Sequence, residues 1–188
     1  MDINAAISGR RSARDFTTQT VDDETIRRLI DAAVQAPSAS NEQPWTFTIV
    51  RDPALLDRVS DEAKSYLLAA LPAGPESEGR RASLTDEGFQ LFYHAPALIV
   101  ISGNSQRPGV VEDCALAAQN LMLAAYSVGL GTCWIGLAHG YLNTTDGKNA
   151  LGLPEAWVPV APIIVGYPKA ETPPVARREP EIRWVGQV

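Results

Sequence analysis

The chain has 188 residues, 45% of them apolar, which is enough to bury one hydrophobic core, so we predict a single domain over residues 1–188. Its 16 basic and 22 acidic residues give a net charge of −6, which argues against nucleic acid or an anionic membrane surface as the main partner. No apolar run reaches the length of a membrane span, and the first residues lack the apolar core of a secretory signal.

The N-terminal segment combines a short helix with a cluster of arginines. Apolar residues at helical spacing between Ile3 and Ile7 predict a helix that ends near Gly9. The next five residues, 10–14, carry three guanidinium groups and a hydroxyl. In an acidic protein, such a run suits a compact dianion, because arginine donates charge-assisted hydrogen bonds to phosphate oxygens. The alternative is a solvated surface run that pairs with nearby acids such as Asp15 and Asp22.

A second helix and a polar loop follow. Asp22 is a suitable N-cap for a helix to about Ala36, whose apolar residues recur at core-facing spacing. Pro37 ends it, and residues 38–43 then place hydroxyl and amide side chains before a strand over residues 45–50. Such a loop suits a polar ring edge or a phosphate, and its alternative reading is simple turn chemistry.

The middle of the chain predicts one helix, one loop and two buried strands. Pro53 opens a helix to about Ala70, and residues 72–88 form an exposed loop that either covers a substrate pocket or merely connects. The continuous apolar runs 96–102 and 158–167 are typical of buried strands.

The stretch 113–136 is the most apolar helical segment and predicts a central helix buried on most sides. Asp113, Asn120 and Ser127 recur every seven residues along it. They are either locally satisfied polar groups of the core or an interface, or they mark a helix that faces its own copy in a dimer. Gly129 and Gly131 can adopt the positive φ that ends a helix, and a β-type run over residues 132–136 follows them.

The last third is expected to hold a connection over residues 138–153, with a short helix near Lys148, and a β-type tail over residues 181–188. The two cysteines, Cys114 and Cys133, lie in apolar surroundings, as free buried thiols do, which favours a cytoplasmic location.

Three motifs together resemble those of the nitroreductase family of flavoproteins. They read Arg10-Arg11-Ser12-x-Arg14, Ala36-Pro37-Ser38-x-Ser40-Asn41-x-Gln43-Pro44-Trp45, and Gly129-Leu130-Gly131-Thr132-Cys133-Trp134-Ile135-Gly136. Their order and separation, with the closing Arg177-Arg178, match the family over nearly the whole chain. The resemblance implies an α+β fold with a mixed central sheet flanked by helices, in a homodimer that holds FMN at its interface and exchanges its C-terminal extensions.

The resemblance also assigns roles to individual residues. The phosphate, ribityl chain and pyrimidine edge of FMN would be held in one subunit by Arg10, Arg11, Ser12 and Arg14. The other subunit would supply most of a second set, formed by Pro37, Ser38, Ser40, Asn41 and Gln43. The amides of Ile135 and Gly136 would lie near flavin N5 and O4, and Arg178, with Arg177 as a further candidate, would close on the phosphate. Lys64 and Tyr66 are additional candidate flavin contacts.

The function implied is that of an FMN-dependent oxidoreductase that takes hydride from NADH or NADPH and reduces nitroaromatics, quinones or similar conjugated acceptors with ping-pong kinetics. The chemistry would lie on the flavin, with no catalytic side chain and no metal ligand set. Three alternatives stay open: a related flavoenzyme for dehydrogenation, dehalogenation or flavin fragmentation, a non-catalytic FMN-binding protein, and a dimeric module for another anion without flavin.

Overall fold

The computed structural model describes residues 1–186 and has an α+β fold built on one four-stranded sheet. The strands are β1 (Trp45–Val50), β2 (Ala97–Gly103), β3 (Gly131–Trp134) and β4 (Val158–Gly166). The α-helices are α1 (Ile3–Gly9), α2 (Asp23–Ala33), α3 (Pro53–Ala70), α4 (Glu78–Thr85), α5 (Val110–Ser127), α6 (His139–Leu142) and α7 (Thr145–Ala150). Short 3-10 turns lie at η1 (Ala39–Asn41), η2 (Pro75–Ser77) and η3 (Gly136–Ala138).

The sheet has the strand order β1-β2-β4-β3, and all neighbouring strands in it are antiparallel. This corrects the expected mixed sheet: among the described residues, the parallel part is one isolated bridge between Ser12 and Thr132. The reason lies in the connections. The helices between β1 and β2, for example, leave and return at the same end of the sheet, so that Val50 lies opposite Leu98.

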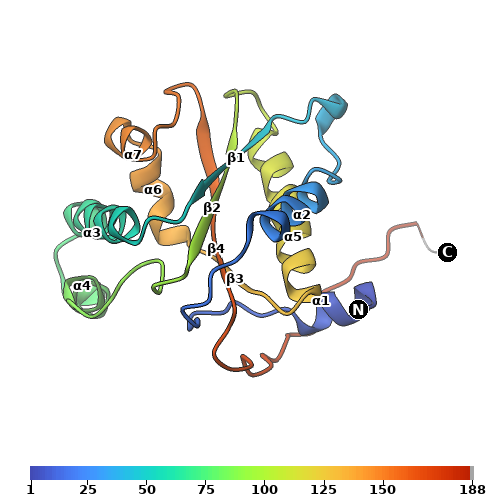
Figure 1. The fold of residues 1–188 in the computed structure, drawn as a ribbon, viewed down its shortest axis with the longest axis horizontal. Helices are drawn as coiled ribbons and strands as arrows, with labels where there is room; N and C mark the ends of the chain where they lie inside the picture. The colour runs from blue at the N-terminus through green and yellow to red at the C-terminus, as the bar shows by residue number, and fades with distance from the viewer. Residues whose placement is uncertain (187–188) are drawn as a thin grey trace.

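The sheet divides the molecule into two packed layers (Figure 1). The helices α2 and α5 cover one face, and α3 and α6 cover the other. Alternate residues of β2 serve the two cores: Ile99 and Ile101 pack with α2 and α5, whereas Leu98 and Val100 pack with α3 and α6. None of the helices in residues 1–186 is long and apolar enough to cross a membrane.

The central helix α5 packs against the sheet, α2 and α1, as expected of a helix buried on most sides, and leaves one side open. Ala117, Leu121 and Ala125 face the sheet and are fully buried. On the opposite side, the apolar Leu116 is 46% exposed, and Val128, just after the helix, is 59% exposed. One chain therefore leaves an apolar surface of this helix uncovered.

The polar residues of α5 have partners within the chain. Asp113 accepts a hydrogen bond from the backbone N–H of Ala39 at 3.0 Å, and Asn120 donates to the carbonyl of Ala32 at 3.3 Å. These two contacts agree with the reading of locally satisfied polar groups.

The local signals placed most elements correctly. Asp22 caps α2 by accepting from Thr25 N–H at 2.7 Å, although the helix ends at Ala33 and not near Ala36. The expected loop over residues 72–88 is wrong, because it contains η2 and α4. Only Leu84 of α4 is buried, so the segment has little apolar pattern by which a helix is recognised.

The tail after β4 leaves the body of the protein. Residues 171–186 form no helix or strand and are exposed, so the β-type segment expected near Trp184 is not a strand in the single chain. Residues 187–188 of that prediction lie outside the described residues.

Candidate functional site

The arginine-bearing segment 10–17 runs alongside the β3 edge of the sheet. Ser12 bridges Thr132, and Ala13 N–H donates to Thr132 O at 3.0 Å. Further along, Thr17 N–H donates to Tyr167 O at 2.8 Å. These backbone bonds fix the segment as an addition to the sheet.

Gly131 permits this close approach. A Cβ atom at Gly131 would lie 2.6 Å from the Cβ of Ala13. The residue belongs to β3 and lacks a positive φ, so of the two glycines only Gly129, with φ +82°, uses the left-handed conformation at the helix end. A glycine at position 131 is thus required by packing against the arginine segment.

Alternation along the segment separates Arg11 from the other two arginines. Arg11 and Ala13 line a groove of about 330 Å³ between α1, the end of α5 and the start of the tail. The Arg11 guanidinium donates to the carbonyls of Ser8 at 2.7 Å and Arg10 at 2.8 Å, so it closes the C-terminal end of α1. Arg10, Ser12 and Arg14 occupy the alternate positions, which in an extended segment face the other way.

Arg10 and Arg14 carry uncompensated charge. Within residues 1–186 neither forms an ion pair, and the acids that could have paired with them are engaged elsewhere. Asp15 pairs with Lys169 at 2.7 Å, and Asp22 caps α2. The Arg14 guanidinium instead lies 5.9 Å from the centre of the Tyr93 ring. The alternative of a run neutralised by Asp15 and Asp22 therefore does not describe this segment.

The end of β3 offers one free amide where two were expected. Ile135 N–H donates to Pro162 O at 2.8 Å and continues the sheet, so it is not free for a ligand, which corrects that expectation. Gly136 N–H has no backbone acceptor among the described residues, and an added Cβ atom there would meet nothing within 4 Å. Gly136 thus combines a free donor with open space.

The loop before β1 is conformationally unusual. Three of its non-glycine residues, Ser40, Asn41 and Gln43, have positive φ values of 53°, 55° and 49°. Ser38 Oγ accepts from Gln43 N–H at 2.9 Å, and the Gln43 side chain donates to Asn41 Oδ1 at 3.1 Å. Such backbone conformations cost free energy and are often found at functional sites. The sequence indicated the polarity of this loop but not its left-handed backbone.

The loop is held in place by an ion-pair network at the N-terminal end of α5. Arg107 pairs with both Glu42 of the loop and the buried Asp113. Asp113 also accepts the hydrogen bond from Ala39 described above. The loop is therefore fixed to α5 before any ligand binds.

One chain does not bring the loop and the arginine segment together. Through the strand pairing, Thr132 lies level with Ala97, and Trp45 lies level with Gly103. The two corners lie six residues apart along β2, which is about 20 Å. Across the sheet they lie three strand spacings apart, which is about 14 Å. The pale blue loop and the dark blue segment after α1 accordingly lie at opposite corners in Figure 1.

The remaining candidates are dispersed. Arg177 and Arg178 lie in the exposed tail, and no hydrogen bond or ion pair joins either to the rest of the described chain. Lys64 donates to the carbonyl of Phe89 at 2.9 Å, and Tyr66 packs against Tyr141 with ring centres 6.4 Å apart. Lys64 and Tyr66 therefore each have a structural partner within the chain.

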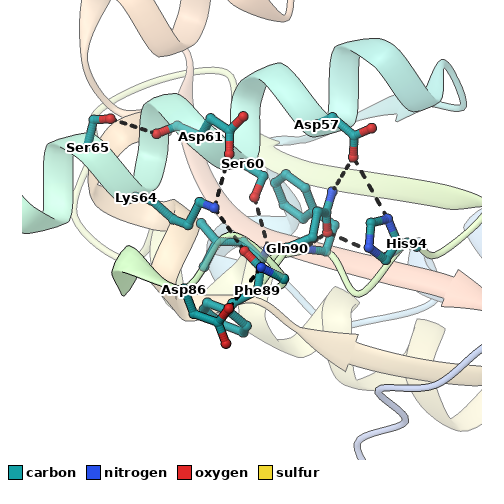
Figure 2. A network of polar contacts seen from close by, with 12 residues as sticks. Asp57, Ser60, Asp61, Lys64, Ser65, Asp86, Phe89, Gln90 and His94 are labelled. Carbon is teal, nitrogen blue, oxygen red and sulfur yellow. Dashed lines mark hydrogen bonds and ion pairs between the residues drawn. The ribbon is translucent and has the colours of Figure 1, made fainter. Parts of the chain in front are cut away.

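Sequence reasoning missed a network that links α3 to the segment before β2 (Figure 2). Asp57, Ser60 and Lys64 lie along one face of α3 and contact three consecutive residues, Phe89, Gln90 and Leu91. Directly after this anchor, Tyr93 and His94 both have positive φ, 54° and 49°. The signal available in the sequence was the spacing of the polar residues in α3 at i, i+3 and i+7.

Comparison with known proteins gives concordant matches. The family model described as "Nitroreductase family" matches residues 7–167. A Methanothermobacter thermautotrophicus protein, provisionally named NADH dehydrogenase/NAD(P)H nitroreductase, is 34% identical over 178 residues, covering 92% of this chain and 80% of that protein. The 5,6-dimethylbenzimidazole synthase of Rhodospirillum rubrum is 30% identical over 181 residues, covering 91% and 84%. A nitroreductase from Desulfitobacterium hafniense, solved with bound FMN, superposes with a TM-score of 0.82 at 28% identity, covering 98% of this chain and 99% of that one.

Proposed function

The chain belongs to the nitroreductase family, and from that premise we propose that it is an FMN-dependent oxidoreductase that uses NADH or NADPH to reduce nitroaromatics, quinones or similar conjugated acceptors. The main support for the proposal is that the guanidinium groups of Arg10 and Arg14 have no ion-pair partner among the described residues. Both lie on a segment that backbone hydrogen bonds fix to the edge of the sheet. That segment runs beside the strand that ends at Gly136, with its free amide.

The residues present fit FMN. Its phosphate carries nearly two negative charges. The phosphate would be bound by Arg10 and Ser12 and, from the tail, by Arg178 with Arg177. Arg14 would lie at the pyrimidine edge, where negative charge increases on reduction, and Gly136 N–H would donate to N5 or O4. When bound, FMN would take hydride from the nicotinamide and pass reducing equivalents to the acceptor in turn, so we expect ping-pong kinetics. Arg11 would contribute by closing α1 and not through the phosphate.

A homodimer would complete this site. The loop residues Pro37, Ser38, Ser40, Asn41 and Gln43 lie at the far corner of the sheet and would reach the flavin only from a second copy. The apolar side chains left open on one chain support such a partner: Ile3 of α1 is 61% exposed, Leu116 of α5 lies open, and Trp184 of the tail is 73% exposed. Large exposed apolar surfaces of this kind mark interaction sites.

The cysteines support a reducing compartment. Cys114 and Cys133 are both free and buried. Burial, together with the neighbouring charge of Asp113, raises the pKa of the Cys114 thiol to about 12. We therefore place the protein in the cytoplasm, as one FMN-binding domain over residues 1–188.

A second candidate keeps the flavin but changes the reaction. The chain is 30% identical to a 5,6-dimethylbenzimidazole synthase, whose name denotes a reaction other than nitro or quinone reduction, and this similarity favours the second candidate. Detection of 5,6-dimethylbenzimidazole after incubation of the FMN-loaded protein with NADH or NADPH would favour this candidate over the first.

The proposed function is tested by spectroscopy on the purified protein. We expect FMN to copurify or to bind when added, and the flavin absorbance to bleach with NADH or NADPH and to recover with a nitroaromatic or quinone. Free FMN at the same concentration is the control. A protein that binds FMN but bleaches no faster than this control would be a non-catalytic FMN-binding protein, and one that rejects FMN would overturn the proposal.

A further inference from the structure

We propose that Tyr93 is a positioning residue that holds the Arg14 guanidinium in place for the flavin; this inference rests on the proposed function. Among the described residues Arg14 forms no ion pair, and its recorded side-chain partner is the Tyr93 ring, 5.9 Å from the guanidinium carbon to the ring centre. A cation over an aromatic face at this distance is attracted to the ring and loses orientational freedom.

The position of the Tyr93 ring is itself fixed from two sides. Phe89 packs edge-on against it, with ring centres 6.0 Å apart. The backbone of Tyr93 is left-handed, as is that of His94, and two consecutive residues in this conformation persist only where the surroundings impose it.

The α3 network imposes that conformation (Figure 2). Gln90 donates to Asp57 of α3 at 3.2 Å, and its side-chain oxygen accepts from the backbone N–H of Phe92 at 2.5 Å. The buried Ser60 accepts from Leu91 N–H at 2.9 Å, while Lys64 holds the Phe89 carbonyl. The turn is thus anchored to a rigid helix immediately before Tyr93, and the helix indirectly sets where Arg14 lies.

A fixed Arg14 should affect the reduced and the oxidised flavin differently. A cation held against the pyrimidine edge stabilises reduced, anionic flavin more than oxidised flavin, whereas a freely rotating Arg14 would lose part of this difference. The informative quantity is therefore the ratio of the dissociation constants for oxidised and reduced FMN, obtained from the midpoint potential of bound FMN relative to free FMN.

The test compares two substitutions at Tyr93. Tyr93→Asn removes the ring but suits the left-handed backbone, and Tyr93→Phe keeps the ring. We expect Tyr93→Asn to lower the ratio about two- to fivefold, as loss of one exposed cation–π contact implies. Tyr93→Phe should leave it unchanged. The control His94→Asn makes the same kind of change one residue along. The exposed His94 ring lies 3.9 Å from the Asp57 carboxylate and does not contact Arg14, so the ratio should stay unchanged, while Gln90 keeps its own hydrogen bond to Asp57.

A double-mutant cycle then decides the mechanism. Introduced into Arg14→Leu, which should lower the ratio by itself, Tyr93→Asn should have no further effect. An equal effect with and without Arg14 would overturn the inference, since Tyr93 would then act directly on the flavin or on the fold, and so would an unchanged ratio in Tyr93→Asn. If the wild-type protein binds no FMN at all, the proposed function fails together with this inference; if it binds and reduces FMN normally, only the role of Tyr93 is at stake.

Discussion

At the scale of single residues, the three N-terminal arginines are not equivalent. Arg10→Ala should weaken FMN binding by about 1.5–3 kcal/mol, because it removes a charge-assisted contact to phosphate. Arg11→Ala should instead cost about 1–2 kcal/mol of folding stability, because its guanidinium donates to the carbonyls of Ser8 and Arg10 at the end of α1.

Isothermal titration with FMN and urea denaturation of the FMN-free proteins separate these two effects. If Arg11→Ala loses as much FMN affinity as Arg10→Ala while its stability is unchanged, the alternation along residues 10–14 does not describe the bound state.

At the scale of elements, the link between the η1 loop and α5 rests on Asp113. Asp113→Ala removes a buried partner of Arg107 and the acceptor of the Ala39 N–H, so we expect a loss of about 3 kcal/mol in the free energy of unfolding. FMN affinity should also fall, because the loop that the partner subunit would present is no longer held. The measurements are urea denaturation of the FMN-free protein and FMN titration.

Ser127→Ala is the matched control at the other end of the same helix. Its exposed hydroxyl donates to the carbonyl of Ala124 in its own helix, so its removal should change stability by less than about 0.5 kcal/mol. Equal effects of the two substitutions would show that the loop is not anchored through Asp113.

The elements that the sequence predicted are those whose signals are local. The N-cap Asp22, the N1 residue Pro53 and the apolar runs of β2 and β4 act within a few residues, and each marks the element found there. The helix α4 was missed because it has one buried residue, Leu84, and so lacks the repeated apolar spacing by which a helix is recognised.

In the candidate site, too, local sequence signals predict some features, whereas contacts between distant parts of the chain decide others. Residue type and order, together with the family resemblance, gave the arginine segment, the polar loop and Gly136 as candidates. Strand pairing, which is non-local, decided that Ile135 N–H is taken by Pro162 and that Gly131 serves close packing against Ala13. The left-handed backbone of Tyr93 could not be predicted, because tertiary contacts from α3 hold the turn and tyrosine seldom adopts this conformation.

At the scale of the whole molecule, the tail and the open faces of α1 and α5 share one feature: each leaves apolar side chains exposed in a single chain. Ile182 is 62% exposed and Trp184 is more exposed still, although burial of each such side chain stabilises a protein by about 2–3 kcal/mol. A tail that packs across a second copy would recover this free energy. It would also carry Arg177 and Arg178 toward the flavin phosphate. In a single chain, neither arginine forms a hydrogen bond or ion pair with the rest of the described residues.

Two variants separate the apolar and the charged contributions of the tail. A chain that ends at residue 170 should shift from dimer to monomer at micromolar concentration and should lose bound FMN, since half of each proposed site comes from the partner. The full-length Arg177→Ala/Arg178→Ala variant keeps Ile182 and Trp184, so it should remain dimeric while binding FMN more weakly. Light scattering after gel filtration gives the mass, and the ratio of flavin to protein absorbance gives the occupancy. A shortened chain that stays dimeric and fully loaded would exclude the tail from both the interface and the phosphate site, and would leave α1 and α5 as the surfaces that hold the two copies together.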